Sequence, residues 1–436
     1  MTDLIPAGYP DARRARRAMV VLALTGFFMS MDITLTTLLI EPMKRDMGLT
    51  DIEIGLLQGT AFGLAFGLSS IPLGRLIDSH NRIRLLVAGL LVWMLGMAGT
   101  AFASSITLLV LCRIALGVVF ALIIPAAVSV IADLFPPEKR SVATSLFAVG
   151  QASGQAFGIL AGGLMFDALT RMLTSNPGLL DGLAPWRALY LAAAFLAIVL
   201  LVPLLMIEEP TRQERKEKAT AVSAAFRELW AYRSFLIPLL AAMLFSQMAL
   251  QAASVWATPL LIRNHHLSPG QFAGWLSGIT FVGGIVGALA GGQGAELGRR
   301  RKGRAGVLIP ALIAALATAP LSFFALAPGV PLFAAMLALN LMMGAATATI
   351  GVIAITLNIP NEIRGLALGS NVFVSAIFGV ATAPAAIALL SQLLGGEAML
   401  GQAIAGVSLP GALLAAVFFV LAMRGARRTG LAEGAA

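Results

Sequence analysis

Cysteine and charge are both scarce in this chain. Its 436 residues include a single cysteine, Cys112, which excludes a disulfide within the chain. Charged residues make up 12% and hydrophobic residues 58%, whereas a soluble domain averages about 25% charged residues. These proportions exclude an ordinary soluble domain and predict an all-α polytopic membrane protein.

The motifs of common soluble enzymes are also missing. There is no nucleophile–base constellation, no P-loop and no dinucleotide fingerprint, and the glycine-rich stretches lie inside apolar runs. We therefore expect no enzyme activity, no cofactor and no metal site. The net charge of +9 would suit a nucleic-acid partner, but the basic residues flank apolar runs, as membrane anchors do, so none is expected.

Long apolar runs dominate the chain. A bilayer core requires about 20 apolar residues per helix, and twelve runs of this kind are predicted to span it. They cover residues 18–40, 54–77, 84–103, 107–131, 141–166, 187–207, 234–261, 271–293, 305–326, 331–357, 364–393 and 399–423. The division is an N-terminal bundle (1–207), a linker (208–233) and a C-terminal bundle (234–436).

Lysine and arginine predict the orientation. With the N-terminus in the cytoplasm, 24 of the 30 basic residues lie on the cytoplasmic side, as the positive-inside rule requires. We expect a multi-pass protein of the cell (inner or plasma) membrane with both termini cytoplasmic. The linker would also be cytoplasmic, either as a tether or with an amphipathic helix that carries Phe226 and Trp230 at the membrane surface.

The two halves repeat each other. The segment from Pro136 to Ala143 after the fourth run matches Pro360 to Ala367 after the tenth, which aligns Arg140 with Arg364. The segment from Gly74 to Asp78 likewise matches 292–296, which ends in Glu296. Internal duplication with a substrate site near the bilayer midplane is typical of secondary transporters.

Glycines recur every four residues in several runs. The second and fifth runs carry Gly55, Gly59, Gly63, Gly67, Gly150, Gly154, Gly158 and Gly162. Such stripes allow close helix approach. Static packing explains any single stripe, whereas stripes on equivalent runs favour a moving interface between the halves.

Asp32 and Arg113 are the only charged residues placed deep inside apolar runs. Each is nine residues from the same predicted membrane face, or about 13 Å, so the two are expected to pair. A structural ion pair is the alternative, but buried pairs stabilise poorly compared with apolar packing. We therefore predict a role in substrate binding or coupling.

The second half has amides in place of buried charges. Gln247, Gln251 and Asn340 are candidate substrate residues, with Phe120 as an apolar lining residue of the first half. Each amide could instead bond a neighbouring helix. Together they predict a site that is charged on one side and apolar on the other, which suits an amphipathic solute.

The loop from Gly74 through Asp78 to Arg82 and Arg84 resembles the cytoplasmic motif of the major facilitator superfamily. The resemblance implies the fold of that family, with two six-helix pseudo-repeats. It also implies a cytoplasmic gate, which we assign to Gly74, Asp78, Arg82, Arg84, Arg140, Glu296 and Arg364. Ser79 and Asn81 depart from the motif by replacing a basic residue and a glycine.

The stretch from Asp32 to Gly59, with Arg113 to Gly117 and Trp256 to Arg263, resembles the spinster-type branch, which exports lysolipids and sphingolipid phosphates. The resemblance carries Asp32 and Arg113 over as functional residues. Family members have Arg where this chain has Ile33, and Glu where it has Phe120. A second proton-coupling carboxylate is therefore missing, and at most weak proton coupling, through Asp32, is expected.

These features together predict a monomeric secondary active or facilitative transporter that works by alternating access. Its substrate would be a small amphipathic or organic-anion solute, with a lysolipid as one candidate. A multidrug or metabolite efflux transporter outside the spinster branch is the alternative. A transporter-like receptor or a membrane-embedded enzyme is a more remote one.

Overall fold

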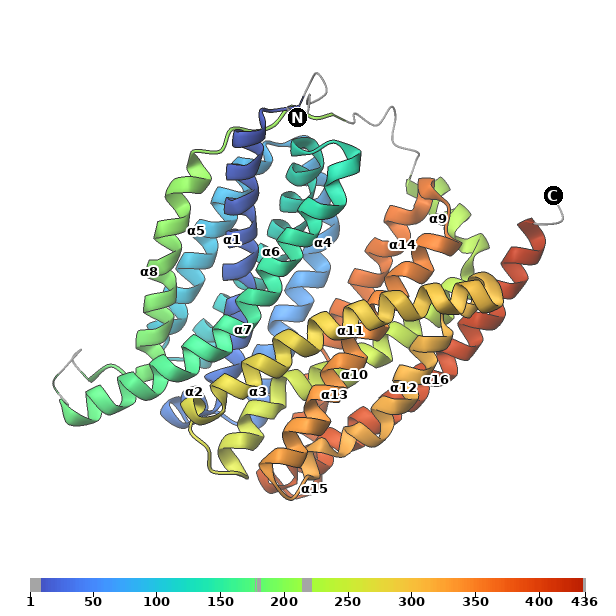
Figure 1. The fold of residues 1–436 in the computed structure, drawn as a ribbon. Helices are drawn as coiled ribbons and strands as arrows, with labels where there is room; N and C mark the ends of the chain where they lie inside the picture. Colours follow the sequence, from blue (N-terminus) through green and yellow to red (C-terminus); the bar gives the residue numbers. More distant parts are fainter. Residues whose placement is uncertain (1–8, 177, 179–181, 214–221, 434–436) are drawn as a thin grey trace. The chain divides into compact units, whose positions relative to one another are not determined.

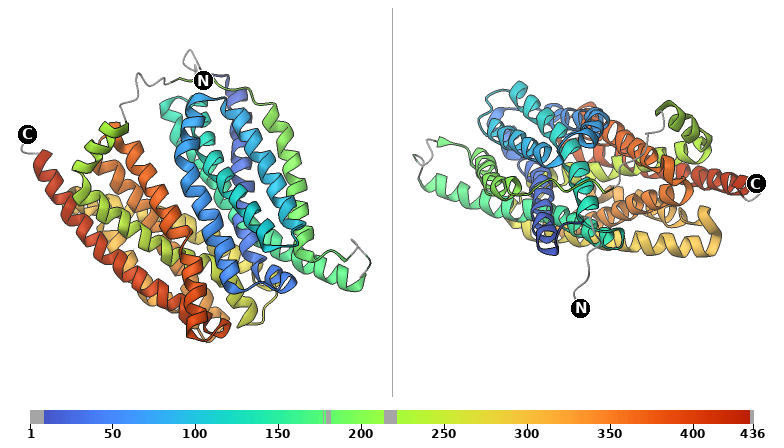
Figure 2. Two further views of the ribbon diagram at one scale, coloured as in Figure 1. Left: turned by 180° about the vertical axis from the view of Figure 1, so that it is seen from behind. Right: turned by 90° about the horizontal axis from the view of Figure 1, so that it is seen from above.

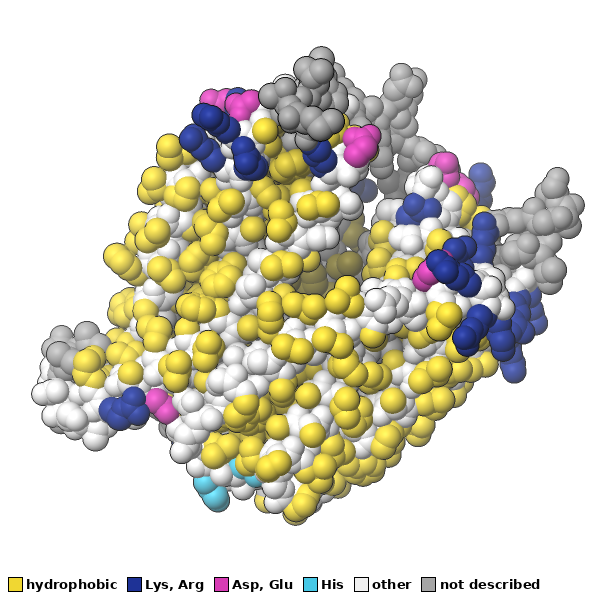
Figure 3. Space-filling model, viewed as in Figure 1, with side chains coloured by type: hydrophobic (Ala, Val, Ile, Leu, Met, Phe, Trp, Pro, Cys, Tyr) yellow, Lys and Arg dark blue, Asp and Glu magenta, His cyan; other side chains and the backbone are white. Residues whose placement is uncertain are grey.

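The computed structural model describes residues 9–176, 178, 182–213 and 222–433. Over these residues, twelve helical segments are long and apolar enough to cross a membrane, which confirms the predicted count. They span Ala12–Leu38, Asp51–Ser79, Arg82–Ala101, Ile106–Leu134, Pro137–Ser175, Pro185–Leu205, Arg233–Arg263, Pro269–Gly306, Ile309–Leu326, Val330–Asn358, Asn361–Leu394 and Glu397–Arg428. Figure 3 shows apolar side chains over the long helices of the visible face, as contact with lipid requires.

Several of these segments are made of more than one element. In the first half the helices are α1 (Ala12–Leu38), α2 (Ile40–Met47), α3 (Asp51–Gly55), α4 (Phe62–Ser79), α5 (Arg82–Ala101), α6 (Ile106–Leu134), α7 (Pro137–Ser175) and α8 (Pro185–Leu205). After α9 (Val222–Ala231) come α10 (Arg233–Arg263), α11 (Pro269–Gly306), α12 (Ile309–Leu321), α13 (Val330–Asn358), α14 (Asn361–Val374), α15 (Ala383–Leu394) and α16 (Leu400–Glu433). Two π-helical segments, η1 (Leu56–Ala61) and η4 (Ser375–Val380), interrupt the second and eleventh spans.

The chain groups into two compact units. The first contains residues 1–49, 64–217 and 268–277, and the second contains 50–63, 218–267 and 278–436. The grouping follows the expected halves except for two segments, the start of the second span and the start of the eighth. Figures 1 and 2 show α1, α5, α6 and α8 side by side within the first unit.

Local sequence explains where these helices begin. The Asp11 carboxylate caps α1 by accepting hydrogen bonds from the backbone N–H groups of Arg13 (2.7 Å) and Arg14 (3.0 Å). Ser105 caps α6, and proline occupies the first position of α8, where its missing N–H costs no hydrogen bond. These three helices carry Asp32, Arg113 and Tyr190, which are buried in the first half.

Residues 208–213 of the linker are described, and after a gap the helix α9 begins at Val222. The side chains of Phe226 and Trp230 are exposed. The segment between these two parts of the linker, residues 214–221, lies outside the described residues. A short amphipathic helix is therefore present at the predicted place, and its position on a membrane surface stays a prediction.

The internal repeat is visible in a matching pair of contacts. Arg140 donates to the carbonyl of Phe135 at 3.0 Å, and Arg364 donates to the carbonyl of Ile359 at 3.3 Å. Each arginine thus bonds the residue five positions earlier, just before a helix. The same local structure follows the fourth and tenth spans, as the sequence repeat predicts.

The glycine stripe of the second span lies against α15 and the residues before it, within the second unit. A Cβ on Gly55 would meet Ala385 Cα at 2.9 Å, and one on Gly63 would meet Ala381 N at 2.6 Å. A Cβ on Gly59 would meet the Ala381 carbonyl oxygen at 3.0 Å. These glycines of the first half therefore contact a segment of the second half; that this contact moves during transport stays a prediction.

The stripe of the fifth span has a different partner. Gly150, Gly154 and Gly158 of α7 lie against the backbone of α1, at Ala23, Phe27 and Met31, and Gly162 lies against Leu35. These four contacts lie within the first bundle, and an interface between the halves that involves this stripe stays a prediction. A four-residue glycine period specifies close approach, but it does not specify which helix approaches.

Because the two stripes have different partners, two matched substitutions should have different effects, one on stability and one on transport. Gly154→Leu should force α7 away from α1 and destabilise the first bundle by about 1–3 kcal/mol, as overpacking does. Gly63→Leu should leave that bundle intact and reduce transport, because it separates α4 from the residues before α15. Thermal unfolding and vesicle flux distinguish the two, with Gly284→Leu as the control because Gly284 borders open space. Equal melting temperatures for Gly154→Leu and wild type would contradict this packing.

Candidate buried ion-pair site

The predicted pair of buried charges is present. Asp32 lies on α1 and Arg113 on α6, with the Arg113 guanidinium nitrogen 4.0 Å from an Asp32 carboxylate oxygen. The pairing is therefore confirmed. The distance is at the limit for an ion pair and too long for a direct hydrogen bond.

Two further residues complete a hydrogen-bonded circuit around this pair. Arg113 donates to the Tyr190 hydroxyl of α8 at 3.3 Å, and Tyr190 donates to the Thr36 hydroxyl at 2.9 Å. Thr36 in turn donates to Asp32 at 3.2 Å. Arginine and aspartate are thus linked through two hydroxyls as well as by charge.

The circuit is buried within the first bundle. Asp32 is 3% exposed, Arg113 is 5% exposed and Tyr190 is fully buried. Ions at this depth are costly unless they are paired and hydrogen-bonded. A guanidinium has more N–H donors than this circuit uses, so Arg113 has the capacity to bind an additional anionic group.

Sequence reasoning missed Tyr190 and Thr36. Thr36 lies one helical turn after Asp32, a spacing that brings side chains together on a helix. Tyr190 offered a weaker signal, because an aromatic residue in an apolar run is expected in any core. Only the packing of α8 beside α1 identifies its role.

Phe120 lies on α6, two helical turns beyond Arg113. Its ring makes an edge-to-face contact with Phe66 of α4, with ring centroids 5.6 Å apart. The position at which the spinster-type resemblance implies a carboxylate is therefore part of an aromatic contact here. Its role as a lining residue stays a prediction.

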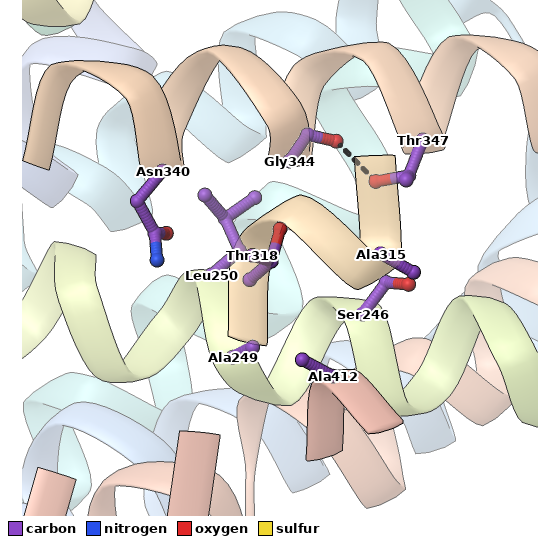
Figure 4. A pocket seen from close by; sticks show the side chains of 9 residues that line it. All are labelled: Ser246, Ala249, Leu250, Ala315, Thr318, Asn340, Gly344, Thr347 and Ala412. Carbon is purple, nitrogen blue, oxygen red and sulfur yellow. Dashed lines mark hydrogen bonds between the residues drawn. The ribbon is translucent and has the colours of Figure 1, made fainter. Parts of the chain in front are cut away.

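Asn340 borders a small closed pocket in the second unit. Figure 4 shows its amide directed from α13 into a space of about 10 Å³ that Ser246 of α10 and Thr318 of α12 also line. Among the described residues, neither the Asn340 amide nitrogen nor the Ser246 hydroxyl has a hydrogen-bond partner. The space is of the size of a single water, so Asn340 does not reach an organic solute in this conformation.

Gln247 and Gln251 are half-buried on α10. The side chain of Gln247 packs against Gly379. A Cβ added to Gly379 would lie 3.1 Å from Gln247 Cγ. Neither amide bonds another described residue, so both retain free donors and acceptors for a ligand. The structure does not bring these two residues together with Asn340 in one described pocket.

Arg82, predicted to act in a cytoplasmic gate, is among the most buried side chains of the first unit, at 1% exposed. It forms ion pairs with Asp133 at the end of α6 and with Glu209 beyond α8, the latter at 2.7 Å. It also donates to the hydroxyl of Ser129 at 3.0 Å. Arg82 therefore joins the ends of three spans within one bundle.

The other gate candidates are more exposed. Glu296 pairs with Arg299 and Arg300 of its own helix, both at 2.7 Å. Asp78 and Arg84 are exposed and have no ion pair among the described residues, and Gly74 borders open space. Their action together with Arg140 and Arg364 as a gate stays a prediction.

The expectation that only Asp32 and Arg113 are buried charges is wrong. Arg263 of α10 holds Asp51 of α3 through two hydrogen bonds of 2.8 Å, and both side chains are at most 10% exposed. Arg82 is a further case. These residues lie at span ends, where hydropathy predicts solvent but packed loops and helix ends exclude it.

Comparisons with known proteins agree with this architecture. Over 415 residues the chain is 26% identical to an MFS-type efflux pump of Mycolicibacterium smegmatis, covering 92% of each chain. It is 32% identical to the puromycin resistance protein of Streptomyces alboniger over 161 residues, which is 37% of this chain and 32% of that one.

Among solved structures, a bacterial homologue of the human lysosomal transporter Spinster, in an inward-facing and unoccupied conformation, superposes with a TM-score of 0.79. The match covers 97% of this chain and 99% of that one at 21% identity, which establishes a shared fold. The family model of the Major Facilitator Superfamily matches residues 22–321. With its twelve spans, this transporter chain belongs to the Major Facilitator Superfamily.

Proposed function

We propose that this protein is a secondary transporter that moves a small amphipathic or organic-anion solute by alternating access. The observation that carries the proposal is the buried circuit of Asp32, Thr36, Arg113 and Tyr190. An intramembrane charge is costly and marks a functional site by default. The unused donors of Arg113 favour a solute with an anionic group.

The apolar surroundings favour a solute that also has an apolar part. Phe120 and Phe66 form an aromatic contact on the same bundle as the circuit. Where spinster-type relatives have a second acid, this chain offers no carboxylate. We therefore propose that proton coupling, if the solute requires it, proceeds through Asp32 alone and is weak.

A specific observation favours a second candidate, efflux of drugs or metabolites. The relative that aligns over 92% of both chains is named an efflux pump. Under this second reading, the proposed direction is out of the cytoplasm. The proposed location is the cell membrane, with both termini cytoplasmic, because 24 of the 30 basic residues then face the cytoplasm.

Flux into sealed vesicles tests the proposal. Purified protein reconstituted in liposomes should move a fluorescent lysophospholipid or a fluorescent carboxylate dye across the bilayer, chemically unchanged and at a rate that saturates with concentration. Protein-free liposomes and an uncharged dye of similar size are the controls. Saturable binding without flux would indicate a receptor, and a chemically altered probe would indicate an enzyme; either result contradicts the proposal.

A further inference from the structure

The residues that line a groove between α5 and α8 are of the kinds that bind a phospholipid. The two helices pack side by side in the first unit (Figures 1 and 2). A groove of about 470 Å³ lies where α5 begins and α8 ends. This volume is within the range of about 300–1,000 Å³ that is usual for small-molecule sites.

The groove is apolar along the spans and polar at its end. Its apolar wall is formed by Val87, Ala88, Leu91, Leu205 and Ile207. Its polar end is formed by Arg84 and Glu208, together with Asn81 and Glu209. A phospholipid needs an apolar wall for its acyl chain and a polar end for its charged headgroup. The bilayer supplies phospholipids at this surface.

Part of the polar capacity at this end is already used. Both carboxylate oxygens of Glu209 accept hydrogen bonds, one from Arg82 and one from the backbone of Ile83. Asn81 accepts from the backbone N–H of Arg84 at 2.8 Å. The charged groups that keep capacity for a ligand are the Arg84 guanidinium and the Glu208 carboxylate, beside the Asn81 amide nitrogen.

These two groups have opposite charges and different surroundings. The Arg84 side chain is exposed and has no ion pair among the described residues. Glu208 bonds Arg14 through one carboxylate oxygen while its side chain is 76% exposed, so its other oxygen can accept further hydrogen bonds. An arginine and a carboxylate at one groove end match a headgroup that carries both a phosphate and an ammonium group.

We propose that this groove binds a glycerophospholipid of the surrounding bilayer with an ethanolamine headgroup. Its phosphate contacts Arg84, its ammonium group contacts Glu208, and an acyl chain lies along Ala88 and Leu91. The site is separate from the circuit around Asp32 and Arg113. The proposal depends on the membrane location of α5 and α8, and it does not depend on which solute is transported.

Native mass spectrometry of the purified protein with added phosphatidylethanolamine tests this site. Wild type should retain one such lipid under conditions that remove the others. Arg84→Gln should lower its occupancy about tenfold, the loss expected for one charge-assisted hydrogen bond. Ala88→Trp should lower it as well, because the ring fills the groove without changing its charge.

Two matched controls separate the site from general effects. Arg301→Gln removes an exposed arginine of the second unit, and Val92→Trp adds the same bulk to an exposed position of α5 outside the groove; both should retain the lipid. Equal occupancy in wild type, Arg84→Gln and Ala88→Trp would overturn the site. Equal retention of phosphatidylglycerol, or no effect of Glu208→Gln, would overturn the ethanolamine assignment.

Discussion

Arg113→Ala is expected to abolish flux and to lower the stability of the purified protein. The substitution leaves Asp32 buried at 3% exposure without its charge partner, and it removes the hydrogen bond to Tyr190. Breaking a buried pair in this way costs about 3–5 kcal/mol. Thermal unfolding in detergent and vesicle flux of the anionic probe measure the two effects separately.

Asp32→Asn serves as the matched variant from the other side of the pair. It keeps the size of the side chain and its hydrogen bond with Thr36, so its stability loss should be smaller than that of Arg113→Ala. Flux should still be strongly reduced, because the uncompensated Arg113 then holds an anionic solute or traps one conformation. Strong transport driven by a pH gradient in Asp32→Asn would contradict the assignment of coupling to this carboxylate.

Arg82→Ala is expected to be the most destabilising change at the ends of the spans. Its side chain is 1% exposed and holds two carboxylates, Asp133 and Glu209, which would then repel each other without a counter-charge. As for the buried pair, the free energy of unfolding should fall by about 3–5 kcal/mol. We expect Arg82→Ala to show a lower protein yield, a lower melting temperature and reduced flux.

Arg82→Lys tests whether shape as well as charge is required. Lysine keeps the positive charge but lacks the planar fork that reaches several acceptors at once, so it should rescue stability only in part. Arg301→Ala, an exposed arginine of the second unit, should have no effect. A wild-type melting temperature for Arg82→Ala would contradict the role of Arg82 in joining α5 to α6.

Hydropathy predicted the twelve spans well because the bilayer imposes a minimum apolar length on every helix. It could not predict the π-helical segments Leu56–Ala61 and Ser375–Val380. These two segments contact each other in the second unit although they are far apart in the sequence. For the same reason, sequence showed that the glycines of α7 permit close packing, but not that α1 is their partner.

The candidate site was predictable in part. Asp32 and Arg113 stood out because charge inside an apolar run is rare, and equal depth predicted their contact. Tyr190 and Thr36 carry no such signal, since hydroxyl and aromatic residues are ordinary in membrane helices. The burial of Arg82 was unpredictable because the segment that covers it, around Glu209, follows a different span.

The central claim is that the pair of Asp32 and Arg113 acts in transport and is not a scaffold. The most direct test is vesicle flux of the anionic probe by the double variant Asp32→Asn with Arg113→Gln, after its melting temperature has been measured. Removing both charges leaves no unpaired ion, so the double variant should recover most of the stability that Arg113→Ala loses. We predict a folded protein without flux; wild-type flux in this variant would show that the pair is only structural.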